Sequence, residues 1–243
     1  DGLRLRKSVR LPRDGSELPA VLDAYRERRT IPNLCGMAVI TAGQEWAPGA
    51  YVPSATLTDA AVVEEAAALI RTKSAMVVKY APNFRHLKAE LTSGELMPRE
   101  FHEYVRRTRP PSAPGTIGSH FEVFYGQKEL ETKRMLVEGN HLVISSSGAE
   151  NGCYGFFDFD WMIQPPFVTV PRTGSIGAAH VQEWPAGATS DCLLLIPRAD
   201  TPLEFHYIAA AVLRRERWRF NYGRKMTPTK IEKFVMPTGL QIV

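Results

Sequence analysis

The stretch CLLLIPRADTPLEFHYIAAAV, residues 192–212, sets the character of the second half of the chain. Its first five residues, 192–196, form a short apolar run of strand length. Thr201 then suits the N-cap of a helix, with Pro202 at the first helical position and Glu204 three residues after the cap, the pattern of a capping box. Apolar residues at helical spacing predict the buried face of this helix: Phe205, Ile208, Ala209 and Val212.

Upstream of this stretch, short β-rich runs alternate with polar turns. We predict strands at 141–145, 154–157, 167–170 and 178–181, with loops at 146–152 and 172–177 between them. Within the first loop, Asn151-Gly152 is a favoured type I′ turn pair. Downstream, Thr227-Pro228 predicts a short helix that bears Ile231 and Phe234. Strands grouped apart from helices predict an α+β domain rather than a doubly wound sheet.

The first half of the chain is expected to be mostly helical. Ser16 suits the N-cap of a helix that ends near Thr30, because Ile31 precedes a proline. A strand at 37–40, a loop at 43–54, a helix at 59–71 and a helix beginning at Pro98 follow, and 75–78 is too short to assign. RPPSAPG, residues 109–115, is the clearest linker, so we place the domain boundary there: a helical segment at 1–114 and a β-rich domain with flanking helices at 115–243.

Composition narrows the class of protein. The 243 residues are 44% hydrophobic and 23% charged, enough to bury a core, and no apolar run is long enough to cross a bilayer. Three distant cysteines at no metal-ligand spacing predict neither a disulfide framework nor a zinc site, and favour a cytoplasmic location. A net charge of +4 weakly favours an acidic partner such as nucleic acid. The sequence opens with Asp1 and not with a methionine, and we interpret this start as a cut point inside a longer polypeptide.

One segment, at residues 164–167, is close to a known catalytic motif. Gln164-Pro165-Pro166-Phe167 is close to the Asn/Asp-Pro-Pro-Tyr/Phe loop of adenine-N6 methyltransferases, but glutamine is one methylene longer than asparagine. The glycine-rich turn that would hold the methyl donor is also missing. We therefore interpret 164–167 as a proline-bounded entry into a strand. No phosphate loop, nucleophile elbow or His-x-x-x-His pair occurs, and we predict no catalytic residue, metal site or cofactor in this chain.

Two polar segments could contact nucleic acid. RTGSIG, residues 172–177, offers a cation, two hydroxyls and two glycines, and an ordinary hairpin fits it equally well. WRFNYGRK, residues 218–225, mixes aromatic rings, cations and an amide, as nucleic-acid surfaces do. A helix C-terminus stabilised by basic residues is the alternative, and spacing alone does not separate the two.

Taken together, residues 115–237 resemble the target recognition domain of type I restriction enzyme specificity subunits and of related adenine-N6 methyltransferases. The matching pieces occur in the family's order: FEVFYGQK (121–128), LVISSS (142–147), NGCYG (151–155), PFVTV (166–170) with GSIG (174–177), ATSD (188–191), and WRFNYGRK with Ile231 and Met236-Pro237. In the first half, WAPGAYVP (46–53) is similar to the end of type I modification subunits. Residues 56–109 form a longer segment than is expected between the end of a modification subunit and a recognition domain. They can belong to either of these two parts or form a helical spacer.

The resemblance implies sequence-specific DNA recognition, by a fragment whose parent is an adenine-N6 methyltransferase that uses S-adenosylmethionine. Expected partners are double-stranded DNA and a methyltransferase domain or subunit, and no membrane. Expected phosphate contacts are Lys128, Lys133, Arg172, Arg224 and Lys225. Expected base-reading residues are Ser146, Glu150, Asn151, Thr173 and Ser175. The alternatives are a protein-interaction module on a β-rich scaffold and, less favoured, a catalytic methyltransferase.

Overall fold

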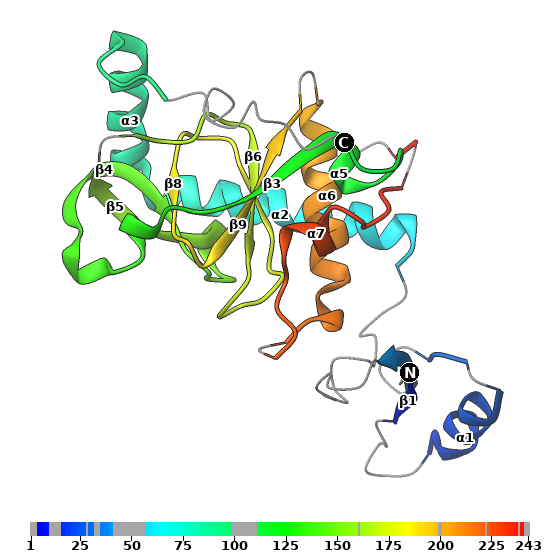
Figure 1. The fold of residues 1–243 in the computed structure, drawn as a ribbon. Helices are drawn as coiled ribbons and strands as arrows, with labels where there is room; N and C mark the ends of the chain where they lie inside the picture. Colours follow the sequence, from blue (N-terminus) through cyan, green and yellow to red (C-terminus); the bar gives the residue numbers. More distant parts are fainter. Residues whose placement is uncertain are drawn as a thin grey trace.

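The structure is a computed structural model that describes residues 4–9, 16–27, 29–31, 35–40, 57–98, 111–159, 161–198, 201–221, 223–237 and 239–240. Its first unit contains β1 (Arg4–Val9), α1 (Leu18–Glu27) and β2 (Cys35–Ile40), and in Figure 1 this blue unit lies apart from the other described elements. β1 and β2 pair antiparallel, with Arg4 opposite Ile40. The predicted helix after Ser16 and the strand at 37–40 are confirmed, while β1 was not predicted.

A four-stranded antiparallel sheet forms the centre of the molecule. Its strand order is β3 (Phe121–Tyr125), β9 (Cys192–Pro197), β6 (Phe167–Pro171) and β7 (His180–Gln182). Along β9 the side chains alternate between two cores, with Leu193 and Leu195 in one and Leu194 and Ile196 in the other. A strand covered on both faces reads as a continuous apolar run, which explains the composition of 192–196.

Helices cover the first face of this sheet: α2 (Asp59–Lys79), α5 (Ile117–His120), α6 (Leu203–Arg215) and α7 (Pro228–Ile231). α2 packs along α6 and contributes Val62, Ala66 and Leu69 to the core it shares with the sheet. This packing does not follow the boundary expected at 114, because α2 lies before the linker and yet is buried against elements that come after it.

A second, three-stranded sheet packs on the other face. Its order is β5 (Cys153–Asp158), β4 (Val137–Ile144) and β8 (Gly187–Ala188), with β4 antiparallel to β5 and parallel to β8. Leu142 and Ile144 of β4 meet Phe167 and Leu194 of the central sheet. α3 (Ala81–Ser93) closes this core with Phe84, beside β4 in Figure 1.

The expectation of an α+β fold is confirmed, with three details corrected. α2 continues through 75–78, which the sequence left unassigned, and α3 was not predicted. The predicted capping box is wrong: α6 has Pro202 at its N-cap with no side-chain cap. The Thr201 hydroxyl instead donates to the carbonyl oxygens of His120 and Arg198, at 3.1 and 2.8 Å, so it fixes the connection between β9 and α6.

The loop predicted at 43–54 and the helix predicted from Pro98 onward fall on residues 41–56 and 99–110, outside the described part of the chain. None of the helices in the described ranges is both long and apolar enough to span a membrane.

Candidate nucleic-acid interface

Several loops meet at one end of the central sheet. Tyr125 pairs with Leu193 and Pro171 pairs with Cys192, so β3 and β6 finish where β9 begins. The residue after β6 is bonded to the residue before β9, because the Arg172 amide donates to the Asp191 carbonyl at 2.9 Å. The Arg172 guanidinium lies 4.9 Å from the centroid of the Tyr125 ring. Stacking on an aromatic face holds this cation in place without neutralising it.

The β4–β5 connection reaches the same end. The Ser175 amide donates to the Ser146 carbonyl at 3.1 Å, which ties the 172–177 turn to the 146–148 loop. Gly174, at φ +55°, makes this approach possible, because a Cβ there would lie 3.0 Å from the Ser146 hydroxyl oxygen. A side chain at this position would push the two loops apart.

The segment after α6 completes the cluster. A Cβ added at Gly177, which has φ +74°, would lie 2.6 Å from the Cβ of Arg217 and 2.8 Å from the Met226 methyl carbon. The 172–177 turn therefore packs directly against the segment that carries Arg217, Arg224 and Lys225. The Arg224 amide donates to the Asn221 side-chain oxygen at 2.8 Å and closes a tight turn there. We call these three segments (146–148, 172–177, and the one bearing Arg217, Arg224 and Lys225) the loop end.

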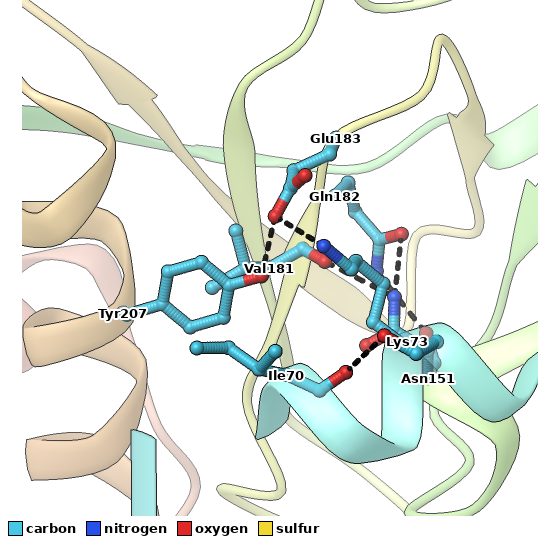
Figure 2. Close-up of polar contacts among 8 residues, drawn as sticks. Ile70, Lys73, Asn151, Val181, Gln182, Glu183 and Tyr207 are labelled. Atoms are coloured by element: carbon cyan, nitrogen blue, oxygen red, sulfur yellow. Dashed lines mark hydrogen bonds and ion pairs between the residues drawn. The ribbon is translucent and has the colours of Figure 1, made fainter. Parts of the chain in front are cut away.

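Beneath the loop end, Asn151 is the centre of a buried polar network (Figure 2). Its side-chain amide donates to the Val181 carbonyl at 3.0 Å and to the Gln182 side-chain oxygen at 3.1 Å. The Gln182 amide donates in return to the Asn151 carbonyl at 3.1 Å and to the Thr169 hydroxyl at 3.0 Å. Asn151 is 1% exposed, so the prediction that it reads base edges is wrong for this conformation. It anchors the loop instead.

The Asn151-Gly152 turn itself follows the sequence prediction in its backbone. Asn151 has φ +53° and Gly152 has φ +79°, the left-handed pair that a type I′ turn requires. Glu150 also has a positive φ, of 49°. Three consecutive left-handed residues fold the chain back sharply, which explains how Asn151 comes to point inward while 146–148 stays at the surface.

Glu150 is held by the end of α2. Its carboxylate pairs with the Lys79 ammonium and accepts a hydrogen bond of 2.8 Å from the Tyr80 hydroxyl. These two hydrogen bonds, from Lys79 first and Tyr80 second, lower the pKa of Glu150. The Glu150 side chain keeps 40% of its surface exposed. Base reading by Glu150 stays a prediction, and a base bound there would share the carboxylate with Lys79.

His180 supports the 146–148 loop from below. The side chain is fully buried, and its Nε2 lies 3.1 Å from the Ser147 carbonyl oxygen. Burial, aided by the charge of Arg214, lowers its pKa to about 4. The ring is therefore neutral at pH 7, and Nε2–H donates to Ser147. No sequence signal indicates this role, because a lone histidine in a strand has no distinguishing neighbour.

An ion pair and a hydrogen bond join two covering helices to Glu183, the residue that follows β7. In Figure 2 the Glu183 carboxylate accepts from both Lys73 of α2, at 2.7 Å, and the Tyr207 hydroxyl of α6. Burial, followed by the hydrogen bond to Glu183, raises the pKa of Tyr207. Tyr207 therefore stays protonated and donates. These contacts fix α2 and α6 against β7, on which the loop end rests.

The remaining predicted residues divide into two groups. Ser175 is exposed, and Ser146, Arg172, Thr173, Arg224 and Lys225 are partly exposed, all at the loop end. Lys128 is exposed at the start of a short 3₁₀ turn, η2 (Lys128–Leu130), three residues beyond Tyr125. Lys133 begins a second 3₁₀ turn, η3 (Lys133–Met135), and its ammonium donates to the Tyr154 carbonyl of β5 at 3.1 Å. Sequence reasoning missed Arg217, which is exposed beside Gly177.

The segment that is close in sequence to a methyltransferase loop is the entry to a strand. Gln164-Pro165-Pro166 leads directly into β6, and Phe167 is fully buried, which confirms its interpretation as a strand entry. Among the described residues, no three His, Cys, Asp or Glu side chains are grouped closely enough to hold a metal ion.

No family model and no curated protein matches this sequence. Among solved structures, the chain is similar to the crystal structure of the type I restriction-modification system S subunit from M. genitalium, with 16% sequence identity and a TM-score of 0.38. The similarity covers 73% of this chain and 45% of that subunit, so the chain spans less than half of the subunit's length.

Proposed function

We propose that this chain binds double-stranded DNA with its loop end and reads the base sequence there for a restriction-modification adenine-N6 methyltransferase. The observation that carries the proposal is the meeting of three polar segments at one end of the sheet. The Ser175–Ser146 hydrogen bond and the contact of Gly177 with Arg217 join them. The resemblance of residues 115–237 to target recognition domains supports the same function.

The cations of the loop end suit the DNA backbone. Arg172, Arg217 and Arg224 lie on neighbouring segments, and Arg172 is oriented by the Tyr125 ring. Arginine presents a planar fork of donors that matches phosphate oxygens. Contacts of this kind fix the register of a protein on the duplex but carry no sequence information.

The hydroxyls and glycines of the 172–177 turn suit base reading. Ser175 is exposed and Thr173 partly so, and each hydroxyl can both donate and accept a hydrogen bond. The turn is held at both flanks, by Ser146 and by the segment after α6, so these hydroxyls are presented on a fixed backbone. Fixed donors lose little entropy on binding, which favours discrimination between bases.

The proposal assigns no methyl transfer to this chain. The target adenine would be flipped out of the helix into a methyltransferase domain or subunit that binds S-adenosylmethionine. This division leaves recognition to the loop end and chemistry to the partner.

The test is the salt dependence of binding to a random-sequence duplex, followed by fluorescence anisotropy. We expect the affinity of the wild-type chain to fall steeply with salt, and Arg172→Gln/Arg217→Gln to lower the log–log slope by about two units. The matched control is Arg85→Gln/Lys88→Gln, which removes two exposed cations from α3. Absence of DNA affinity at low salt would contradict the proposal and favour a protein-binding role. Equal slopes for the two double variants would show that the loop end is not the DNA-binding surface.

A further inference from the structure

A second cationic feature lies beside the loop end, between the end of α6 and α7. It is a pocket of about 230 Å³ lined by Leu57, Glu216, Arg219, Lys230, Lys233, Phe234 and Val235. Three of these side chains are cations and one is an acid. The apolar residues form one wall of the pocket, and the three cations keep exposed surface that a ligand can reach.

The acid in the pocket is already paired. The Glu216 side chain is 7% exposed and its carboxylate forms an ion pair with the Nε of Arg219. Arg219 is further held between two rings, with its guanidinium carbon 5.3 Å from the Trp218 centroid and 5.4 Å from the Phe234 centroid. The guanidinium is thus fixed in the pocket wall, and its terminal amino groups remain as donors beyond the pair with Glu216.

The two lysines leave the pocket with excess positive charge. The Lys230 ammonium donates to the Lys225 carbonyl at 3.0 Å, and both lysines are exposed. Partial desolvation and, second, the charge of Arg224 lower the pKa of Lys230. Positive charge is therefore crowded here, and an anion that entered the pocket would relieve it.

The pocket continues the loop end. Lys230 reaches the backbone of Lys225, and Arg219 is in η5 (Arg217–Arg219), whose first residue packs against Gly177. In Figure 1 the orange segment after α6 connects this region to α7. A duplex lying along the loop end would bring its sugar-phosphate backbone toward this side.

We infer that this pocket binds one phosphate of the DNA backbone next to the segment read by the loop end. The inference rests on the proposed function and adds a specific phosphate site to it. A phosphodiester suits the donors present, because Arg219 offers a fixed planar fork and the lysines are mobile point charges. None of the described lining residues carries the amide side chain that pairs with adenine.

The test compares Lys230→Gln/Lys233→Gln with the wild-type chain, on the same random duplex, across about 50 to 200 mM salt. Arg219 is left in place, because its removal would leave the buried Glu216 carboxylate without its partner. We expect the double variant to lower the log–log slope by about one unit. Arg85→Gln/Lys88→Gln, with the same change in net charge, should keep the wild-type slope, and thermal unfolding should show that all three proteins are folded.

Each outcome bears on a different claim. A wild-type slope that survives in Lys230→Gln/Lys233→Gln overturns the phosphate pocket and leaves DNA binding by the loop end intact. A slope reduced equally by the α3 control overturns the pocket as a specific site, because net charge would then account for the effect. A wild-type chain without salt-dependent DNA affinity overturns the proposed function and, with it, the phosphate site.

Discussion

The 172–177 turn and the 150–152 segment contain similar polar residues in opposite surroundings. Thr173 and Ser175 face outward, while Asn151 is buried and bonded to Gln182 and Val181. Two connections that look alike in sequence therefore have different roles. The inner segment, 150–152, forms a buried platform with Val181 and Gln182. The outer turn, 172–177, presents donors above this platform. The comparison predicts that substitutions in the inner segment change stability, whereas those in the outer segment change binding.

The largest expected effect belongs to the inner network. Asn151→Ala removes the donor to Val181 and Gln182, leaves both acceptors buried without it, and places alanine at a positive φ. We expect a loss of about 4 kcal/mol in the free energy of unfolding, measured by urea denaturation. A loss under about 1 kcal/mol would show that the network is not what holds the inner segment.

The pH dependence of stability tests the same platform. The pKa of His180 is lowered in the folded protein to about 4, so the unfolded chain binds the proton more tightly. The stabilisation from neutral His180 is complete above pH 6.5 and is lost as the pH falls toward 4, by about 3 kcal/mol. His180→Gln should lack that part of the decline, in urea unfolding at pH 7 and pH 4.5. Parallel declines in both proteins would remove His180 as the cause.

Gly177 joins the 172–177 turn to the segment after α6, and its substitution should affect both stability and binding. Gly177→Ala would place a Cβ 2.6 Å from that of Arg217, at φ +74°. We expect a loss of about 2 kcal/mol in stability from strain and displacement, with weaker DNA binding. Gly239→Ala is the matched control, because Gly239 has a similar φ of +78° and no atom within 4 Å of an added Cβ. Equal losses would mean that backbone strain alone acts at Gly177.

Arg172→Gln should separate binding from stability. We expect DNA affinity to fall by about 1 kcal/mol with an unchanged midpoint of urea unfolding, because the proposal assigns Arg172 to a phosphate and its stack on Tyr125 contributes little to folding. Anisotropy and denaturation on the same preparation give both values. Loss of stability without loss of affinity would assign Arg172 to the platform.

The smallest effect is expected for Ser175→Ala. The exposed hydroxyl should change stability by less than about 0.5 kcal/mol, because the Ser146 contact uses the Ser175 backbone amide. We expect unchanged affinity for random duplex and an altered base preference, measured by selection from a random-sequence library. An unchanged preference would leave Ser175 without a reading role.

The sequence predicted β4, β5, β6, β7, β9 and α6, because buried strands and an amphipathic helix leave strong periodic signals, but it did not predict β3 or β8. It could not predict that α2 packs against α6, since this contact joins residues such as Val62 and Val212 that are distant in the chain. It also treated Asn151 and Ser175 alike, because burial depends on how the three left-handed residues at 150–152 turn the backbone. The role of Arg217 depends on contact with Gly177, which no spacing reveals.

The most direct measurement of the central claim is the mapping of backbone amide resonances by NMR as duplex DNA is added at low salt. If the loop end binds DNA, the largest shifts fall on 146–148, 172–177 and the segment with Arg217, Arg224 and Lys225, while α3 is unaffected. Shifts confined to α3, or no shifts at all, would contradict DNA binding by the loop end.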